Sequence, residues 1–152
     1  MPIPEDMRRR SRREAGQAVV ELALVLPLLL LLLLGIVQFG SVFRDYIALT
    51  DATRVGARQA SVSRSIQPPA NREPTIVTKV HSAGVNLDPA KMTITVELRD
   101  PAGTVQTPNS ADTSWQPSGD VTVRATYPFK ISLFGQVIFT GTLKSRTTER
   151  IE

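Results

Sequence analysis

A single carboxylate, Glu21, stands immediately before an apolar run that extends from Leu22 to Phe43 without one charged residue. A carboxylate at the edge of a membrane span costs roughly 3 kcal/mol unless a partner compensates its charge. The chemistry that this position favours is therefore ion pairing with a cation. A plainer interpretation places Glu21 at the membrane interface, at the N-terminus of a helix, where the helix dipole favours an acid.

The rest of the chain offers no set of residues that would support catalysis. It contains no Cys and one His, His81, which removes thiol chemistry and most metal sites. No nucleophile elbow, phosphate-binding loop, zinc-binding helix motif or dinucleotide fingerprint occurs. We therefore predict a protein that is not an enzyme and needs no cofactor or metal, with His81 as an ordinary surface or half-buried residue.

The apolar run has the length of a membrane-spanning helix. Its 22 residues would extend about 33 Å, which matches the hydrocarbon core of a bilayer. Basic residues before such a run keep that flank in the cytoplasm, so the C-terminal part should lie outside. The net charge of +4 is weak for a nucleic-acid partner, and the dense basic cluster lies beside the apolar run, which indicates a cytoplasmic flank instead. The basic cluster consists of Arg8, Arg9, Arg10, Arg12 and Arg13.

Two other interpretations of the run fit less well. A cleaved secretory signal has an apolar region of about 7–15 residues and a cleavage site of small residues, and "GIVQFGSVFRD" (Gly35–Asp45) offers no such site. A buried core helix of a soluble protein would show a polar face, whereas Leu28–Leu34 is an unbroken series of leucines.

The stretch "GQAVVELALVLPLLLLLLLGIVQFGSVFRDYIALTDATRVGARQASV" (Gly16–Val62) closely resembles the TadE-like family of the tight-adherence (Flp) pilus system. The resemblance lies in the V-E-L-A-L-V-L-P opening, in G-I-V-Q-F-G at the end of the run, and in the arginine- and glycine-containing segment Ala52–Arg58. "VTVRATYPF" and the final "TERIE" also resemble that family, whereas residues 63–118 match only in general plan.

This resemblance implies a function. A membrane-embedded prepilin peptidase would cut after Gly16, so that the mature chain begins at Gln17 and Glu21 becomes its fifth residue. The carboxylate could then pair with the new amine of a neighbouring pilin or pseudopilin and set the axial register. Leu22 follows the glutamate where the main pilin commonly has an aromatic residue, which favours a minor pseudopilin. The alternative is a permanently anchored surface binding module that is never cut.

Beyond the membrane, the periodicity predicts that the helix continues with one apolar face, which would cover the protein's own sheet rather than form an exposed partner site. The prolines in "SIQPPANREP" (Ser65–Pro74) should end it, and a second helix should extend from Thr75 to Ala83, before Gly84. The predicted apolar face comprises Phe43, Tyr46, Ile47, Leu49, Ala52, Val55, Gly56 and Ala60.

Three strands follow from alternating patterns: Lys91–Asp100, Asp120–Phe129 and Val137–Glu152. We expect Pro128 to end or bend the second strand and Gly141 to form a bulge in the third. Residues 101–119 read as a long polar connection. In it, Trp115 would either contact a partner or fold back over the edge of the core.

The predicted fold class is α+β, with one N-terminal transmembrane helix that extends into a pilin-like domain with a small antiparallel sheet. The predicted parts are a basic leader (residues 1–16), the transmembrane helix (17–43) and an extracytoplasmic domain (44–152). The expected location is the bacterial inner membrane. The expected partners are the prepilin peptidase and other subunits of the pilus machine.

Overall fold

The computed structural model describes residues 5–106, 108 and 114–152, with side chains from residue 16 onward. The chain divides into two compact units, Met1–Gly40 and Ser41–Glu152. In chain order the elements are α1 (Glu5–Ile66), α2 (Pro69–Ala83), a short 3-10 turn η1 (Pro89–Lys91), and the strands β1 (Thr93–Arg99), β2 (Val105–Gln106), β3 (Asp120–Leu133) and β4 (Gln136–Arg150). The α+β class, with a long apolar helix and a small antiparallel sheet, is confirmed.

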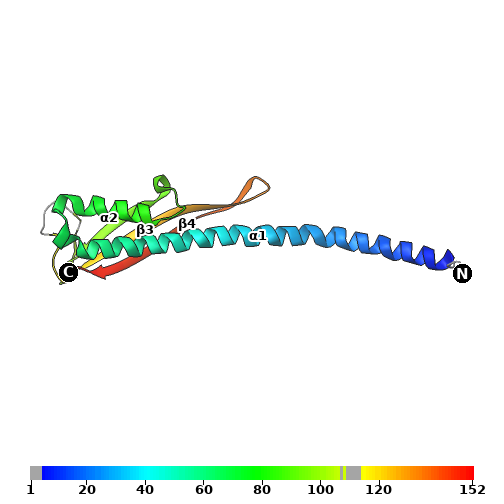
Figure 1. Ribbon diagram of the computed structural model, residues 1–152, viewed down its shortest axis with the longest axis horizontal. Coiled ribbons are helices and arrows are strands. Elements are labelled where there is room, and N and C mark those ends of the chain that lie inside the picture. Colours follow the sequence, from blue (N-terminus) through cyan, green and yellow to red (C-terminus); the bar gives the residue numbers. More distant parts are fainter. Residues whose placement is uncertain (1–4, 107, 109–113) are drawn as a thin grey trace. The chain divides into compact units, whose positions relative to one another are not determined.

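The four strands form one antiparallel sheet in the order β2-β1-β3-β4. Figure 1 labels the two long strands, β3 and β4. β1 pairs with the first half of β3, from Thr93 opposite Thr126 to Arg99 opposite Asp120. β4 pairs with β3 along its whole length, so Asp120 lies opposite Arg150 and Leu133 lies opposite Gln136. One half of the β3–β4 pair is therefore flanked by β1, and the other half is a two-stranded ribbon.

The hydrophobic core of the second unit lies where α1, α2 and one face of the sheet meet. It is built from leucine, valine and alanine side chains, which lie at helical spacing on α1 and at alternate positions on β1 and β3. Packing these apolar faces against one another removes them from water. Its fully buried members include Leu49, Ala52, Ala57, Ala60, Ile76, Val80, Leu98, Trp115, Val121, Val123 and Ala125.

The buried stripe of α1 differs from the predicted apolar face. Leu49, Ala52, Gly56 and Ala60 are buried as expected, which confirms that this part of the helix covers the protein's own sheet. Phe43, Tyr46, Ile47 and Val55 are exposed instead. Small polar residues take the remaining core positions, since each of their hydroxyls can bond to a carbonyl of the preceding turn. These residues are Thr53, Ser61 and Ser63.

The second helix is longer than predicted. It begins at Pro69 rather than Thr75, and Pro74 lies inside it. Pro69 occupies the first turn, where the missing N–H costs nothing. Pro74 is the sixth residue of α2, so it removes the hydrogen bond that an N–H there would donate to the Ala70 carbonyl. The end at Ala83 is confirmed, with the Gly84 amide donating to the Val80 carbonyl at 3.0 Å.

Three features of the sheet were not predicted correctly. The connection 101–119 contains β2, a strand too short to show an alternating pattern. Pro128 does not end β3, because beyond Thr126 that strand is paired on one side only and a residue without an N–H is tolerated there. The bulge is not at Gly141: the register shifts between Ile131 and Ser132. Gly141 is instead needed because a Cβ there would collide with the Phe129 ring.

Gly56 allows α1 to approach α2 and the sheet. A Cβ at this position would collide with the Val80 methyl group and touch Val123. Gly56→Ala gains about 1 kcal/mol in helix propensity but overpacks a site whose neighbours are stiff, at a cost of about 1–3 kcal/mol. We expect a net loss of about 1 kcal/mol in the free energy of unfolding, measured by urea denaturation. Gly40→Ala is the control, because nothing lies within 4 Å of a Cβ there, and an equal loss in both variants would contradict the packing argument.

Candidate processing and assembly site

The predicted processing site, Gly16 and Gln17, lies within α1 and is exposed. Apart from its chain neighbours and the backbone of α1 itself, no atom of the described residues lies within 4 Å of the point where a Cβ at Gly16 would sit. The fold of the protein therefore gives no packing reason for a glycine at this position. The arginine head was predicted to precede this site, and its side chains lie outside those that the structure describes.

Glu21 lies one helical turn after Gln17 on the same side of α1. The Gln17 side-chain amide donates a hydrogen bond from Nε2 to Glu21 Oε1 at 3.2 Å. Such an exposed i, i+4 pair contributes only about 0.2–0.5 kcal/mol. An ionised carboxylate has about four acceptor sites, so this contact leaves most of the Glu21 carboxylate open to a stronger cationic partner.

The apolar helix that follows is unburied. The candidate span lies in α1 within Gly16–Ile66. Its most apolar 18-residue window has a mean hydropathy of 2.9, and none of that window is buried within the described chain. Leucines in this run are exposed on every side of the helix, for example Leu24 at 75% and Leu28 at 67%. A helix that is apolar all round is stable only in lipid or against other apolar helices. This helix fits a single-pass membrane protein.

Two hydroxyl contacts hold the edge strand β4 on α1. Thr53 Oγ1 lies 2.9 Å from Ser145 Oγ and accepts a hydrogen bond from Thr147 Oγ1 at 3.2 Å. β4 lies at one edge of the sheet. The pattern did not show that its Ser and Thr face a buried Thr on α1, since hydroxyl pairing across elements leaves no periodic signature.

The structure decides between the two interpretations of Trp115 and excludes the surface contact. Its side chain is 1% exposed and belongs to the core, and the Arg72 guanidinium carbon lies 5.7 Å from the ring centroid. Arg72 is itself 3% exposed and donates to the Gln67 and Arg64 carbonyls at 3.1 Å. Sequence reasoning missed Arg72, because an arginine in a polar segment gives no sign that it is buried.

The described part of the chain shows no arrangement for metal or acid–base chemistry. No group of three or more His, Cys, Asp or Glu that could hold a metal occurs among those residues. His81 is half-buried near the end of α2. An open depression of about 260 Å³ on α2 is lined by Asn71, Pro74, Thr75, Thr78 and Lys79, which include no carboxylate.

Charged groups in the second unit, Ser41–Glu152, stabilise turns. Lys91 lies 2.9 Å from Asp88, and its ammonium hydrogen bond lowers the pKa of that carboxyl below its ordinary value, helped by the Ala90 amide. The Thr104 amide donates to Asp100 at 2.8 Å and lowers the pKa of Asp100 in the same direction. Both carboxylates lie at turns beside β1, so these shifts reflect local turn geometry rather than a reactive centre.

Comparison with known proteins places a family signature on the same helix. Residues 16–58 match the family model described as TadE-like protein, a segment that begins at Gly16 and includes Glu21, the apolar run and the Ala52–Arg58 segment. No curated protein and no solved structure matches the chain. The match confirms, over residues 16–58, the resemblance to the TadE-like family that the sequence motifs indicate.

Proposed function

We propose that this chain is a minor pseudopilin of a Tad pilus, anchored in the bacterial inner membrane, trimmed after Gly16 by a prepilin peptidase and active in pilus assembly. The observation that carries the proposal is the position of Gly16 and Glu21. Both are exposed at the start of an unburied apolar helix, and both lie inside the segment that matches the TadE-like family.

Trimming would create a new charge beside the apolar run. Cleavage after Gly16 leaves a new α-amino group on Gln17, a cation at the edge of the apolar run. The Glu21 carboxylate of an adjacent subunit is the anion that can compensate it. Each charge by itself is costly in an apolar bundle, and pairing reduces that cost while selecting one axial register.

The rest of the helix supports packing against other subunits. At Gly35 and Gly40, apart from chain neighbours and the backbone of α1, no atom of the described residues lies within 4 Å of a Cβ position. Small residues allow helix backbones to approach closely in a membrane. The outer unit, Ser41–Glu152, would then be carried on the extracytoplasmic side.

The direct test is the intact mass and N-terminal sequence of the protein extracted from membranes of its native host. A chain that begins at Gln17 supports pilin-type processing. A chain that retains the arginine head contradicts the proposal and favours the alternative, a permanently anchored surface module.

A substitution at the proposed cleavage position sharpens this test. In Gly16→Leu, we expect trimming to fall by at least tenfold, because a bulky side chain would stand where the peptidase accepts glycine. The fold should be unaffected, since Gly16 has open space around it. Accumulation of the untrimmed chain is measured by mass spectrometry. Gly35→Leu is the matched control within the same helix, and normal trimming of both variants would refute the site.

A further inference from the structure

The far end of the β3–β4 ribbon presents apolar side chains that the described chain covers only in part, with the Phe139 ring 5.9 Å from that of Phe129. Beyond the pair Thr93–Thr126, β3 has no β1 beside it, while β4 stays paired with it as far as the turn. Four large apolar residues there, named here the hairpin tip, are more than half exposed. They are Phe134 (83%), Val137 (55%), Ile138 (63%) and Phe139 (56%).

The geometry of the turn does not explain these residues. Phe134 and Gly135 both have positive φ, 50° and 81°. Two-residue hairpin turns of this kind favour Asn-Gly or Asp-Gly, and a bulky residue at positive φ is uncommon. Phe134 therefore occupies a position that turn chemistry would give to a small polar residue. The register shift between Ile131 and Ser132 also leaves Ile138 without a partner on β3.

Contacts inside the outer unit determine the direction in which the hairpin projects. The Glu152 amide donates to the Ser61 carbonyl at 3.1 Å, and Ser145 contacts Thr53 at 2.9 Å. From Glu152 back to Ser145, the chain therefore runs alongside α1 from Ser61 to Thr53. The hairpin turn thus projects toward the end of the unit at which Ser41 lies.

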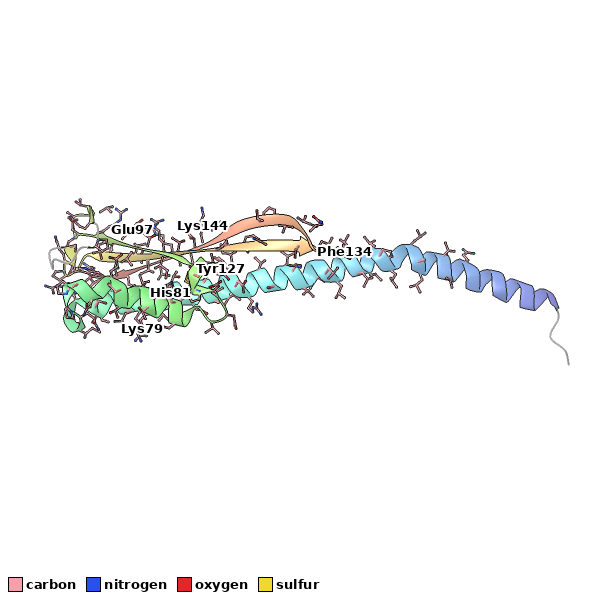
Figure 2. All side chains as sticks on the ribbon, turned by 90° about the horizontal axis from the view of Figure 1, so that it is seen from above. Lys79, His81, Glu97, Tyr127, Phe134 and Lys144 are labelled. Atoms are coloured by element: carbon pink, nitrogen blue, oxygen red, sulfur yellow. The ribbon has the colours of Figure 1, made fainter. Side chains whose placement is uncertain are left out.

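The hairpin is long compared with the helix segment of its own unit. From Ala125, opposite Ser145, to Phe134 the strand extends about 30 Å. From Thr53 back to Ser41 the helix extends about 18 Å. The hairpin tip therefore belongs to the end of the unit at which the chain enters from the apolar run. Figure 2 labels Phe134 at the turn and Tyr127 near the base of the ribbon.

Two further features of that end are typical of a membrane interface. Phe43 and Tyr46 on α1 are exposed, at 64% and 43%, and aromatic side chains are enriched at the headgroup level. Lys130 is exposed on the strand beside the tip, and a lysine can lay its aliphatic stem on apolar surface while its ammonium reaches a phosphate. The pairing of β3 with β4 satisfies only the inward-facing backbone groups of the ribbon, so its contact with the bilayer must stay at the hydrated headgroup level.

We propose that the hairpin tip inserts into the outer-leaflet interface of the bilayer, as a second membrane contact beside the apolar helix. This proposal rests on the membrane anchoring in the proposed function. It does not depend on trimming at Gly16 or on pilus assembly. A shallow insertion of this kind would limit the movement of the outer unit over the membrane surface.

The absence of Cys from the chain allows single-site labelling of the full-length protein. A fluorescent nitrobenzoxadiazole label is placed on Gln136→Cys, which keeps all four tip residues, on Leu30→Cys in the apolar run, and on Ser65→Cys at the other end of the outer unit. Gln136 and Ser65 are both exposed polar residues, so they form a matched pair. Each protein is reconstituted at one chain per nanodisc of phosphatidylcholine and phosphatidylglycerol, with and without nitroxide-labelled lipid.

We expect nitroxide quenching at residues 30 and 136, at least threefold stronger than at residue 65. Adding Phe134→Ser and Ile138→Ser to the Gln136→Cys protein should reduce its quenching to the level of residue 65. Strong quenching at residue 30 with none at residue 136 would overturn the inference and leave the membrane anchor intact. No quenching at residue 30 would overturn the anchor itself. If the label at residue 136 is shielded from water only in discs that hold several chains, and is not quenched by nitroxide lipid, the tip contacts a second copy of the chain. That result would also overturn the inference.

Discussion

Glu21→Ala is expected to insert into the membrane normally and to lose incorporation into the pilus assembly by at least a hundredfold. Removal of one partner from a buried ion pair costs about 3–5 kcal/mol, because the other charge is left uncompensated. In the proposed assembly that remaining charge is the Gln17 amine of the neighbouring subunit. Pilus production in the native host, by shear preparation and immunoblot against the membrane fraction, measures the effect.

A matched variant distinguishes pairing of Glu21 with a neighbouring subunit from its hydrogen bond to Gln17 within α1. Gln17→Ala removes the 3.2 Å contact with Glu21 but retains the α-amine that trimming would create. That contact contributes about 0.2–0.5 kcal/mol, so assembly should fall by less than about threefold once normal trimming is verified by mass. Normal pili from Glu21→Ala, or equal losses from both variants, would show that Glu21 does not act through an intersubunit pair.

Trp115→Ala is expected to destabilise the outer unit by about 3–5 kcal/mol. The indole is 1% exposed, and its removal leaves a cavity beside the buried Arg72 guanidinium. The chain has no disulfide to compensate, and domains of this kind are stable by only about 5–15 kcal/mol. Urea unfolding of the detergent-solubilised chain, followed by circular dichroism of the sheet, gives the change in free energy of unfolding.

Phe134→Ala provides the control for aromatic size. Its ring is 83% exposed, so in detergent solution the stability should change by less than about 0.5 kcal/mol. A loss below about 1 kcal/mol for Trp115→Ala would mean that the indole does not fill the core. A loss of similar size in both variants would mean that the measurement does not report core packing.

Elements with strong local signals were predicted well. The helix beyond Arg44 and the β1 strand repeat their apolar residues at intervals that match helix and strand geometry, and both occur where the pattern places them. β2 and the extension of β3 past Pro128 were missed. A strand of two residues is too short to show an alternating pattern. Pro128 is tolerated in β3 only because the pairing with β1 has ended before it, and that depends on the order of the strands in the sheet.

The sequence by itself determined the apolar helix, the carboxylate before it and the position of Gly16, because a span without charge and an isolated Glu21 are properties of composition and spacing. Only the tertiary structure decided which residues lie inside. Burial depends on what faces a side chain from other elements, so Thr53, Arg72 and Trp115 entered the core while Phe43 and Phe134 stayed exposed. The exposed hairpin tip arises in the same way, from a ribbon that extends farther than β1.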